Sequence, residues 1–316
     1  MTLPTVLAHR LAEQPHARRW LIDELWADEA VGIVGGEPKC CKSFLALDMA
    51  VAVAGGVPCL RHFAPAQTGR VLLFAAEDAL HVVRQRLAGI ARAAGVVLAD
   101  LDIHVITAPS VRLDVELDRD ALTATVSELR PKLLVLDPFV RLHRIDENLS
   151  GEVAPLLAYL RDLQRRFHVA VVLVHHARKG GAKMRAGQAL RGSSEFHAWG
   201  DSNLYLRRHG EQLALAVEHR AAASITAVSL QLAIDGDAVA LAAIERTAAA
   251  VPAAAVAPIT LADKIEAQLA SAGRPLTAAA LRKLCRVRNA SLTAALTELV
   301  AAARVRKDDA GYVISR

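Results

Sequence analysis

The residues best suited to chemistry lie in one short loop near the start of the chain. The loop reads Gly36, Glu37, Pro38, Lys39, Cys40, Cys41, Lys42 and Ser43, and Phe44 follows it. It approximates the phosphate-binding motif G-x-x-x-x-G-K-[ST], whose backbone N–H groups surround the phosphates while the lysine reaches the β/γ-phosphates and the hydroxyl holds Mg²⁺. We therefore expect these nine residues to bind a nucleoside triphosphate together with Mg²⁺.

One position departs from this motif. Cys41 replaces the second glycine, where backbone and phosphate approach closely. The cysteine either weakens nucleotide binding or is tolerated, and the apolar helical pattern that begins at Phe44 favours tolerance, because its N-terminus would face the anion. Oxidation or alkylation of Cys41, or a bridge to Cys40, could also close the site, although a steric substitution without redox meaning is the simpler alternative. A plain strand–turn–helix with a chance lysine is the alternative to the whole motif.

Polar residues end three further apolar segments. Glu77 and Asp78 follow the first, Asp137 ends the second, and His175 and His176 end the third. In an open α/β sheet, ligands bind in the crevice at the carboxyl ends of the strands. These side chains are therefore expected beside the loop. Since neighbouring side chains of a strand point to opposite faces, at most one of the two histidines faces the nucleotide, and the sequence leaves open which one.

The surrounding elements predict an α/β fold. Buried strands are expected at 31–34, 71–78, 133–137 and 169–176, separated by helical stretches, as in a mostly parallel twisted sheet. Shorter strands at 204–206, 213–217, 228–232 and 239–241 are separated by turn residues. They indicate antiparallel hairpins that extend the sheet.

Length and composition restrict the class of protein. A chain of 316 residues can hold one α/β domain and a small second one. Its 4 cysteines give no disulfide framework, and two of them are adjacent in the loop. The first thirty residues carry charges throughout, and no apolar stretch is long enough to span a bilayer. These features favour a reduced, cytoplasmic location and no membrane partner.

The net charge is distributed unevenly along the chain. From Leu261 onward ten Lys/Arg stand against five Asp/Glu, a net charge of +5 that equals the net charge of the whole chain. An aperiodic stretch rich in Ala and Pro precedes this basic tail. We therefore predict an ATPase domain at 1–246, a linker at 247–260 and a basic domain at 261–316, whose charge suggests nucleic acid.

The basic domain has the pattern of a winged helix-turn-helix. Three helical segments are expected, with Thr277 capping the second, and residues 304–314 alternate around a turn as a two-stranded wing. In such domains the third helix enters the major groove of DNA. The candidate DNA contacts are Arg288, Asn289, Ser291, Thr293, Arg304, Arg306 and Lys307. A winged helix used for protein contact is the alternative.

With these motifs in place, residues 1–245 resemble the RecA-like ATPases of the RepA type, hexameric replicative helicases of the family called AAA_25. The matching stretches are Arg19–Ile22, Gly36–Asp48, Ala76–Asp78, Leu136–Pro138, Val174–His176 and Leu190–Ser194. The resemblance implies that Lys42 binds the β/γ-phosphates, that Ser43 and Asp137 hold Mg²⁺, and that Glu77 orients the attacking water. It also implies that His175 or His176 senses the γ-phosphate.

Two basic features extend the resemblance. The run from Ala177 to His197 carries glycines and cations that would face the channel of a ring and grip single-stranded DNA: Arg178, Lys179, Lys183, Arg185 and Arg191. A solvated surface loop is the alternative. Arg207 and Arg208 match the region from which such rings supply an arginine to the neighbouring subunit, with Arg220 as a second candidate.

The resulting hypothesis is a Mg²⁺-dependent ATPase coupled to DNA, a hexameric replicative helicase of a plasmid, phage or mobile element. The first alternative is a recombination or loading ATPase that does not unwind DNA. The second alternative is a DNA-binding regulator that uses the nucleotide as a switch with little turnover, which the missing glycine favours. A strand-displacement assay distinguishes the helicase from the recombination or loading ATPase. ATP turnover measured with and without single-stranded DNA distinguishes these two ATPases from the regulator.

Overall fold

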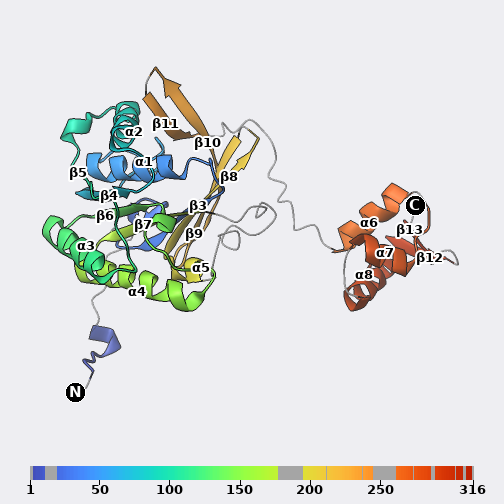
Figure 1. The fold of residues 1–316 in the computed structure, drawn as a ribbon. Helices are drawn as coiled ribbons and strands as arrows, with labels where there is room; N and C mark the ends of the chain where they lie inside the picture. The colour runs from blue at the N-terminus through green and yellow to red at the C-terminus, as the bar shows by residue number, and fades with distance from the viewer. Residues whose placement is uncertain are drawn as a thin grey trace. The chain divides into compact units, whose positions relative to one another are not determined.

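The computed structural model of the chain describes residues 3–10, 20–176, 195–210, 212–236, 238–244, 261–272, 274–285, 289–302, 304–308 and 311–314. It divides into two compact units, Met1–Arg246 and Thr247–Arg316, which are described separately (Figure 1). Among the described residues, no helix combines the length and apolar character that crossing a membrane requires.

The described part of the first unit is built on a nine-stranded sheet of order β11-β10-β9-β8-β3-β7-β6-β4-β5. The strands are β3 (Val31–Gly36), β4 (Val71–Ala75), β5 (Ile103–Val105), β6 (Leu133–Asp137), β7 (Ala170–His176), β8 (Ser202–His209), β9 (Gln212–His219), β10 (Ile225–Asp235) and β11 (Ala238–Ala243). The strands from β5 to β8 run parallel, and β9 to β11 continue as antiparallel hairpins. Both expectations for the sheet are confirmed. A separate ribbon of β1 (Trp20–Ile22) and β2 (Trp26–Ala27) was not predicted.

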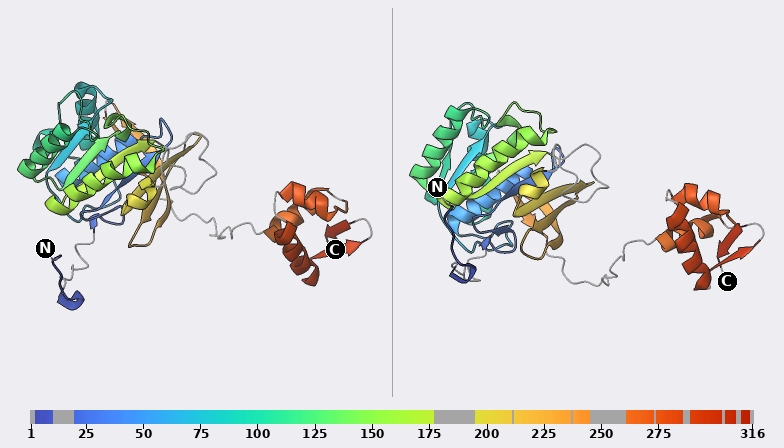
Figure 2. Two further views of the ribbon diagram at one scale, coloured as in Figure 1. Left: turned by 60° about the horizontal axis from the view of Figure 1, so that its bottom comes forward. Right: turned by 90° about the horizontal axis from the view of Figure 1, so that it is seen from below.

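Helices cover both faces of the sheet (Figures 1 and 2). The helices are α1 (Lys42–Gly55), α2 (Leu80–Ala93), α3 (Glu116–Leu129), α4 (Ser150–Phe167) and α5 (Glu195–Trp199), with single turns η1 (Ala8–Arg10), η3 (Leu98–Asp100) and η4 (Phe139–Arg141). The α1 and α2 side chains share one apolar core, and those of α3 and α4 share the other. Because both faces are covered, β3, β6 and β7 are apolar without alternation.

The α1 helix is buried along most of its length, with its residues from Leu45 to Val53 inaccessible to solvent. A helix that is apolar on every side is stable only inside a core. It begins directly after the loop that follows β3, so the packing of α1 fixes the position of that loop.

The second unit contains α6 (Leu261–Ala272), α7 (Ala278–Cys285) and α8 (Asn289–Ala301), followed by the antiparallel pair β12 (Val305–Asp308) and β13 (Gly311–Ile314). Thr277 caps α7, since its Oγ1 accepts a hydrogen bond from the Ala280 N–H at 3.3 Å. Ile265, Leu269, Leu281 and Leu296 are buried at the centre of this unit. Three helices and a two-stranded ribbon thus occur in the expected order.

Candidate nucleotide site

A cavity of about 330 Å³ opens at the carboxyl ends of β3, β4, β6 and β7. It brings together the loop and the polar strand ends that the sequence predicts. Its lining consists of Lys39, Cys41, Lys42, Ser43, Phe44, Ala75, Glu77, Asp78, Arg86, Asp137, Val174 and His176. The parallel register explains this gathering, because Ala75 pairs with Asp137 and Gly36 pairs with His176.

The loop between β3 and α1 has a constrained backbone. A Cβ at Gly36 would lie 2.5 Å from the Leu206 carbonyl oxygen and 2.6 Å from Cys40 Sγ, so this position tolerates only glycine. Lys39 and Cys41 both have left-handed backbones, with φ of 63° and 65°. Glycine adopts that conformation without strain, whereas a cysteine does so at a cost of roughly 1 to 2 kcal/mol. The conformation required of Cys41 is therefore the one that the motif's glycine supplies.

Lys42 lies over its own loop. Its side chain is largely buried, and Nζ donates a hydrogen bond to the Glu37 carbonyl at 2.8 Å. Nζ also lies 3.9 Å from Cys40 Sγ, and burial raises the pKa of that thiol. The lysine stands at the N-terminus of α1, where the helix dipole and the first backbone N–H groups favour an anion.

Asp137 and Ser43 form the pair expected to hold a metal. The Ser43 hydroxyl donates to the Asp137 carboxylate, which is 8% exposed at the end of β6. Burial raises the pKa of Asp137 to about 6; the Ser43 hydrogen bond opposes this rise, and the charges of Asp78 and Glu77 add to it. A cation bound nearby would stabilise the charged form of this buried carboxylate. A carboxylate and a hydroxyl are also the hard oxygen ligands that Mg²⁺ prefers, so the residues present fit the metal.

Two carboxylates past the end of β4 are each paired with an arginine. Glu77 Oε1 accepts from Arg141 Nε at 2.9 Å, and Asp78 Oδ2 accepts from Arg86 Nη1. The Arg86 guanidinium also lies 5.3 Å from the centre of the Phe44 ring. Neither arginine was predicted. Several other arginines lie near each of them in the sequence. Only the positions of α2 and η4 beside the cavity single out Arg86 and Arg141.

The two histidines at the end of β7 point to opposite sides, as expected for neighbouring residues of a strand. His176 lines the cavity. His175 is buried against the other face, where its ring stacks on Phe196 with centroids 4.3 Å apart. The structure thus decides which of the two imidazoles faces the cavity.

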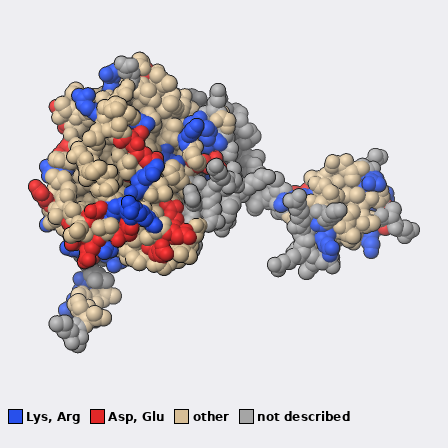
Figure 3. All heavy atoms as spheres, viewed as in Figure 1, with Lys and Arg blue, Asp and Glu red and all other residues tan. Residues whose placement is uncertain are grey.

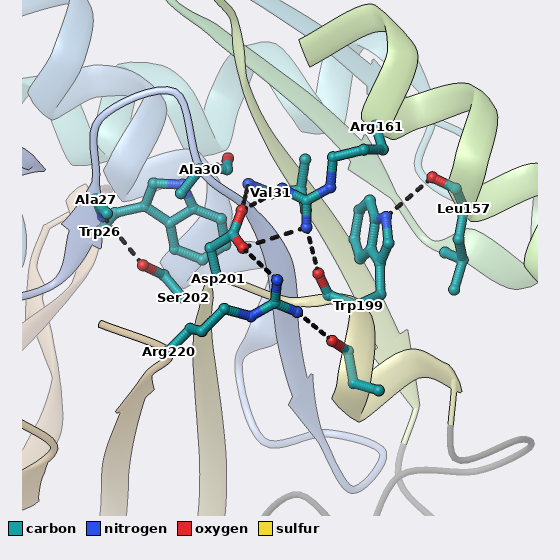
Figure 4. A network of polar contacts seen from close by, with 11 residues as sticks. Trp26, Ala27, Ala30, Val31, Leu157, Arg161, Trp199, Asp201, Ser202 and Arg220 are labelled. Atoms are coloured by element: carbon teal, nitrogen blue, oxygen red, sulfur yellow. Dashed lines mark hydrogen bonds and ion pairs between the residues drawn. The ribbon is translucent and has the colours of Figure 1, made fainter. Parts of the chain in front are cut away.

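The predicted arginine candidates lie at two edges of the sheet. Arg208, near the end of β8, donates to Cys41 Sγ of its own chain at 3.7 Å, and Arg207 precedes it. Arg220 lies at the opposite edge, where the β8 strand begins. It pairs with Asp201 at 3.4 Å and donates to the Ala198 carbonyl (Figure 4). This position removes Arg220 from the cavity of its own chain.

Figure 4 shows what Arg220 does there. Asp201 lies between Arg220 and Arg161, and its Oδ2 also accepts from the Val31 N–H at 3.3 Å. Trp199 Nε1 donates to the Leu157 carbonyl at 2.9 Å. The network joins α4 and α5 to the first residue of β3, to the start of β8 and to the end of β9. It anchors the chain at the start of β8.

Several predicted DNA contacts fall outside the described residues. These are Arg178, Lys179, Lys183, Arg185, Arg191 and Arg288, together with the side chains of Asn289 and Ser291. Arg304 donates to Glu266 of α6 at 2.8 Å, so it is engaged within its own unit. Arg306 and Lys307 are exposed on β12. Figure 3 shows Lys/Arg and Asp/Glu side chains interspersed on the visible face of the larger unit.

Comparison with known proteins supports the family that the motifs indicate. The sequence profile of the AAA_25 family, described as an AAA domain, matches residues 1–182. A crystal structure of the RadB recombinase is similar, with a TM-score of 0.51, 14% identity and coverage of 69% of this chain and 92% of that one. A DnaB-like replicative helicase gives a TM-score of 0.51 and 14% identity, over 67% of this chain and 57% of that one. At this identity the two neighbours establish the fold, and they confirm the RecA-like core.

Proposed function

Because the chain belongs to the AAA_25 family, whose profile spans more than half of it, we propose that it is a Mg²⁺-dependent ATPase that couples ATP hydrolysis to movement on DNA. The observation that carries this proposal is the single cavity wall on which Lys42, Ser43, Asp137 and Glu77 meet. Phosphoryl transfer to water needs cations at the phosphates, a carboxylate for the metal and a second carboxylate near the nucleophile. The four side chains supply these groups.

Each residue has a distinct role in this proposal. Lys42 leaves its contact with the Glu37 carbonyl and neutralises the β/γ-phosphates. Ser43 and Asp137 would hold Mg²⁺, which supplies charge neutralisation at the phosphates when bound. Glu77 accepts a hydrogen bond from the attacking water. His176 reports on the γ-phosphate, because it shares the cavity wall with these residues while His175 does not.

Oligomerisation would complete the site. We propose that Arg207 or Arg208 reaches the nucleotide of a neighbouring subunit in a hexameric ring, where it neutralises transition-state charge. Arg208 donates to the Sγ of Cys41, which lines the cavity of its own chain. Mixing Arg208→Ala chains with Lys42→Ala chains tests the direction. The Lys42→Ala chains retain the arginine, so an arginine acting in trans restores activity at the intact nucleotide sites of the Arg208→Ala subunits.

DNA contacts are proposed for two regions. The cations of 177–194 would bind single-stranded DNA in the ring channel, and 261–316 would act as a winged helix with Arg306 and Lys307 near phosphates. Phosphate contacts predict binding that weakens steeply with salt. The host element would be a plasmid, phage or mobile element, as the RepA resemblance implies.

Titration calorimetry with ATP and Mg²⁺, followed by turnover with and without single-stranded DNA, tests this function. Failure of folded protein to bind ATP in large excess would remove the proposal. Displacement of a strand from a forked substrate supports the helicase, whereas DNA-stimulated turnover without displacement supports a recombination or loading ATPase. Binding without turnover supports the nucleotide-switched regulator, which the replacement of the motif's second glycine by Cys41 favours.

A further inference from the structure

Arg141 and Glu77 form an ion pair at the edge of the nucleotide cavity. Arg141 Nε lies 2.9 Å from Glu77 Oε1, and the two side chains are 60% and 43% exposed. Arg141 belongs to η4, which follows Asp137 at the end of β6, whereas Glu77 follows β4. The pair therefore spans two neighbouring strands, and it joins a cation to the carboxylate assigned to the attacking water.

The position of Arg141 is set by buried neighbours. Phe139 and Leu142, on either side of it, are both inaccessible to solvent. The Phe139 ring lies 4.4 Å from the His143 ring and 5.3 Å from the Phe196 ring, measured between centroids. The backbone of η4 is thus held in the core, and Arg141 projects from a fixed point.

This pairing opposes the role of Glu77 in hydrolysis. A carboxylate that orients water must keep an oxygen free to accept a hydrogen bond from the nucleophile, and it acts best when its negative charge is not neutralised by a closer cation. Arg141 occupies Oε1, which leaves only Oε2 to face the nucleophile, and its guanidinium is the closer cation that partly neutralises the carboxylate. Release of Arg141 would therefore make Glu77 more effective.

We propose that Arg141 is a positioning residue that restrains Glu77 in the absence of nucleic acid and releases it when a phosphate of the DNA backbone takes the guanidinium. The inference rests on the proposed ATPase function and adds a means by which DNA stimulates it. Arginine has five N–H donors in a planar fork that matches phosphate, and only the Nε–H is directed at Glu77.

The exposure of the pair suits such an exchange. Exposed ion pairs contribute little net stability, so a competing phosphate displaces them readily. The neighbouring Arg86–Asp78 pair is less exposed, at 28% and 30%, and Arg86 is also held beside the Phe44 ring. Arg141 is therefore the arginine at this edge that exchanges most easily, while Arg86 stays in place.

Steady-state hydrolysis by the full-length chain tests the inference. At saturating ATP and Mg²⁺, Arg141→Ala is expected to raise kcat without DNA by about two- to fivefold, the rate equivalent of up to about 1 kcal/mol. The ratio of kcat with a single-stranded oligonucleotide to kcat without it should fall toward one, and KM for ATP should stay unchanged. Arg141→Gln provides a second variant in case the alanine chain does not fold.

Two control variants are needed to interpret this experiment. Arg144→Ala removes an exposed cation from the same segment and should leave kcat without DNA unchanged. The double variant Glu77→Gln with Arg141→Ala should be inactive, because the gain passes through Glu77. If wild-type protein hydrolyses ATP but Arg141→Ala shows the same or lower basal kcat with normal stimulation, the inference is wrong and the ATPase stands. If wild-type protein does not hydrolyse ATP, both are wrong.

Discussion

His175 and Phe196 stack face to face, with ring centroids 4.3 Å apart and an interplanar angle of 25°. His175 is the penultimate residue of β7 and lies on the face away from the nucleotide cavity, and Phe196 is the second residue of α5, the helix that precedes β8. The stack therefore joins β7 to α5, the described elements on either side of the basic run 177–194.

Phe196→Ala is expected to destabilise the larger unit by about 3 to 5 kcal/mol, because Phe196 is fully buried against His175 and Phe139 and its loss leaves a cavity. Unfolding in urea, followed by tryptophan fluorescence, measures this free energy, since all three tryptophans lie in this unit. Phe196→Leu serves as the control and should recover most of the stability. An alanine variant as stable as wild type would show that the stack does not hold these segments together.

Asp137→Asn is expected to lower kcat by at least about 100-fold, because the neutral amide is a much weaker ligand for a divalent cation than the carboxylate. ATP binding measured by calorimetry without Mg²⁺ should persist, since Lys42 and the loop remain. The Mg²⁺-dependent gain in affinity should disappear. Normal turnover by the asparagine variant would exclude Asp137 as the residue that holds the metal.

Cys41→Gly is expected to tighten ATP binding and to raise the melting temperature slightly. Glycine relieves the left-handed strain of roughly 1 to 2 kcal/mol, while its larger chain entropy offsets about half of the gain. Cys41→Ala is the matched control, because alanine also lacks the thiol but keeps the strain. Equal ATP affinities for the wild-type, Cys41→Gly and Cys41→Ala proteins would mean that the strain of the left-handed backbone at position 41 does not affect binding.

Thiol chemistry gives a separate prediction at the same residue. Cys41 lines the cavity whereas Cys40 is buried, so a thiol reagent should react at Cys41 and block nucleotide binding. Bound ATP with Mg²⁺ should slow the reaction, which mass spectrometry of the labelled peptide would follow. Labelling at one rate with and without nucleotide would contradict this arrangement.

The stability of the larger unit should fall in weak acid because of His219. Burial lowers the pKa of this imidazole, whose Nδ1 lies 3.0 Å from the Ser202 hydroxyl while Nε2 lies 3.0 Å from the Glu24 carbonyl. A depressed pKa in the folded state means that the unfolded chain takes up the proton first. The stabilising contribution is therefore complete above the ordinary histidine pKa of about 6.5 and is lost as the pH falls below it.

His219→Gln isolates this effect, because an amide can make both hydrogen bonds without titrating. Thermal melts between pH 5 and pH 8, again followed by tryptophan fluorescence, should show a smaller loss of stability for the glutamine variant. If the stability of the wild-type protein and of the glutamine variant falls equally with pH, groups other than His219 cause the acid sensitivity.

The chain's local patterns determined the fold class, the parallel core and the chemical character of the loop. Unbroken apolar runs such as Leu133–Leu136 indicated strands covered on both faces, and Lys42-Ser43 before an apolar helix indicated an anion site. These properties follow from the spacing of residue types along the chain. The β1–β2 ribbon escaped prediction because its strands are only 3 and 2 residues long, too short for a period to appear.

Only the tertiary structure decided which side chains meet. Strand order placed β6 between β4 and β7, and so brought Asp137, Glu77 and His176 to one cavity and sent His175 into the core. The partnerships of Glu77 with Arg141 and of Asp201 with Arg161 and Arg220 join segments far apart in sequence. Such contacts depend on how strands order themselves in a sheet, which is a property of packing across the whole unit and leaves no periodic signal in any one segment.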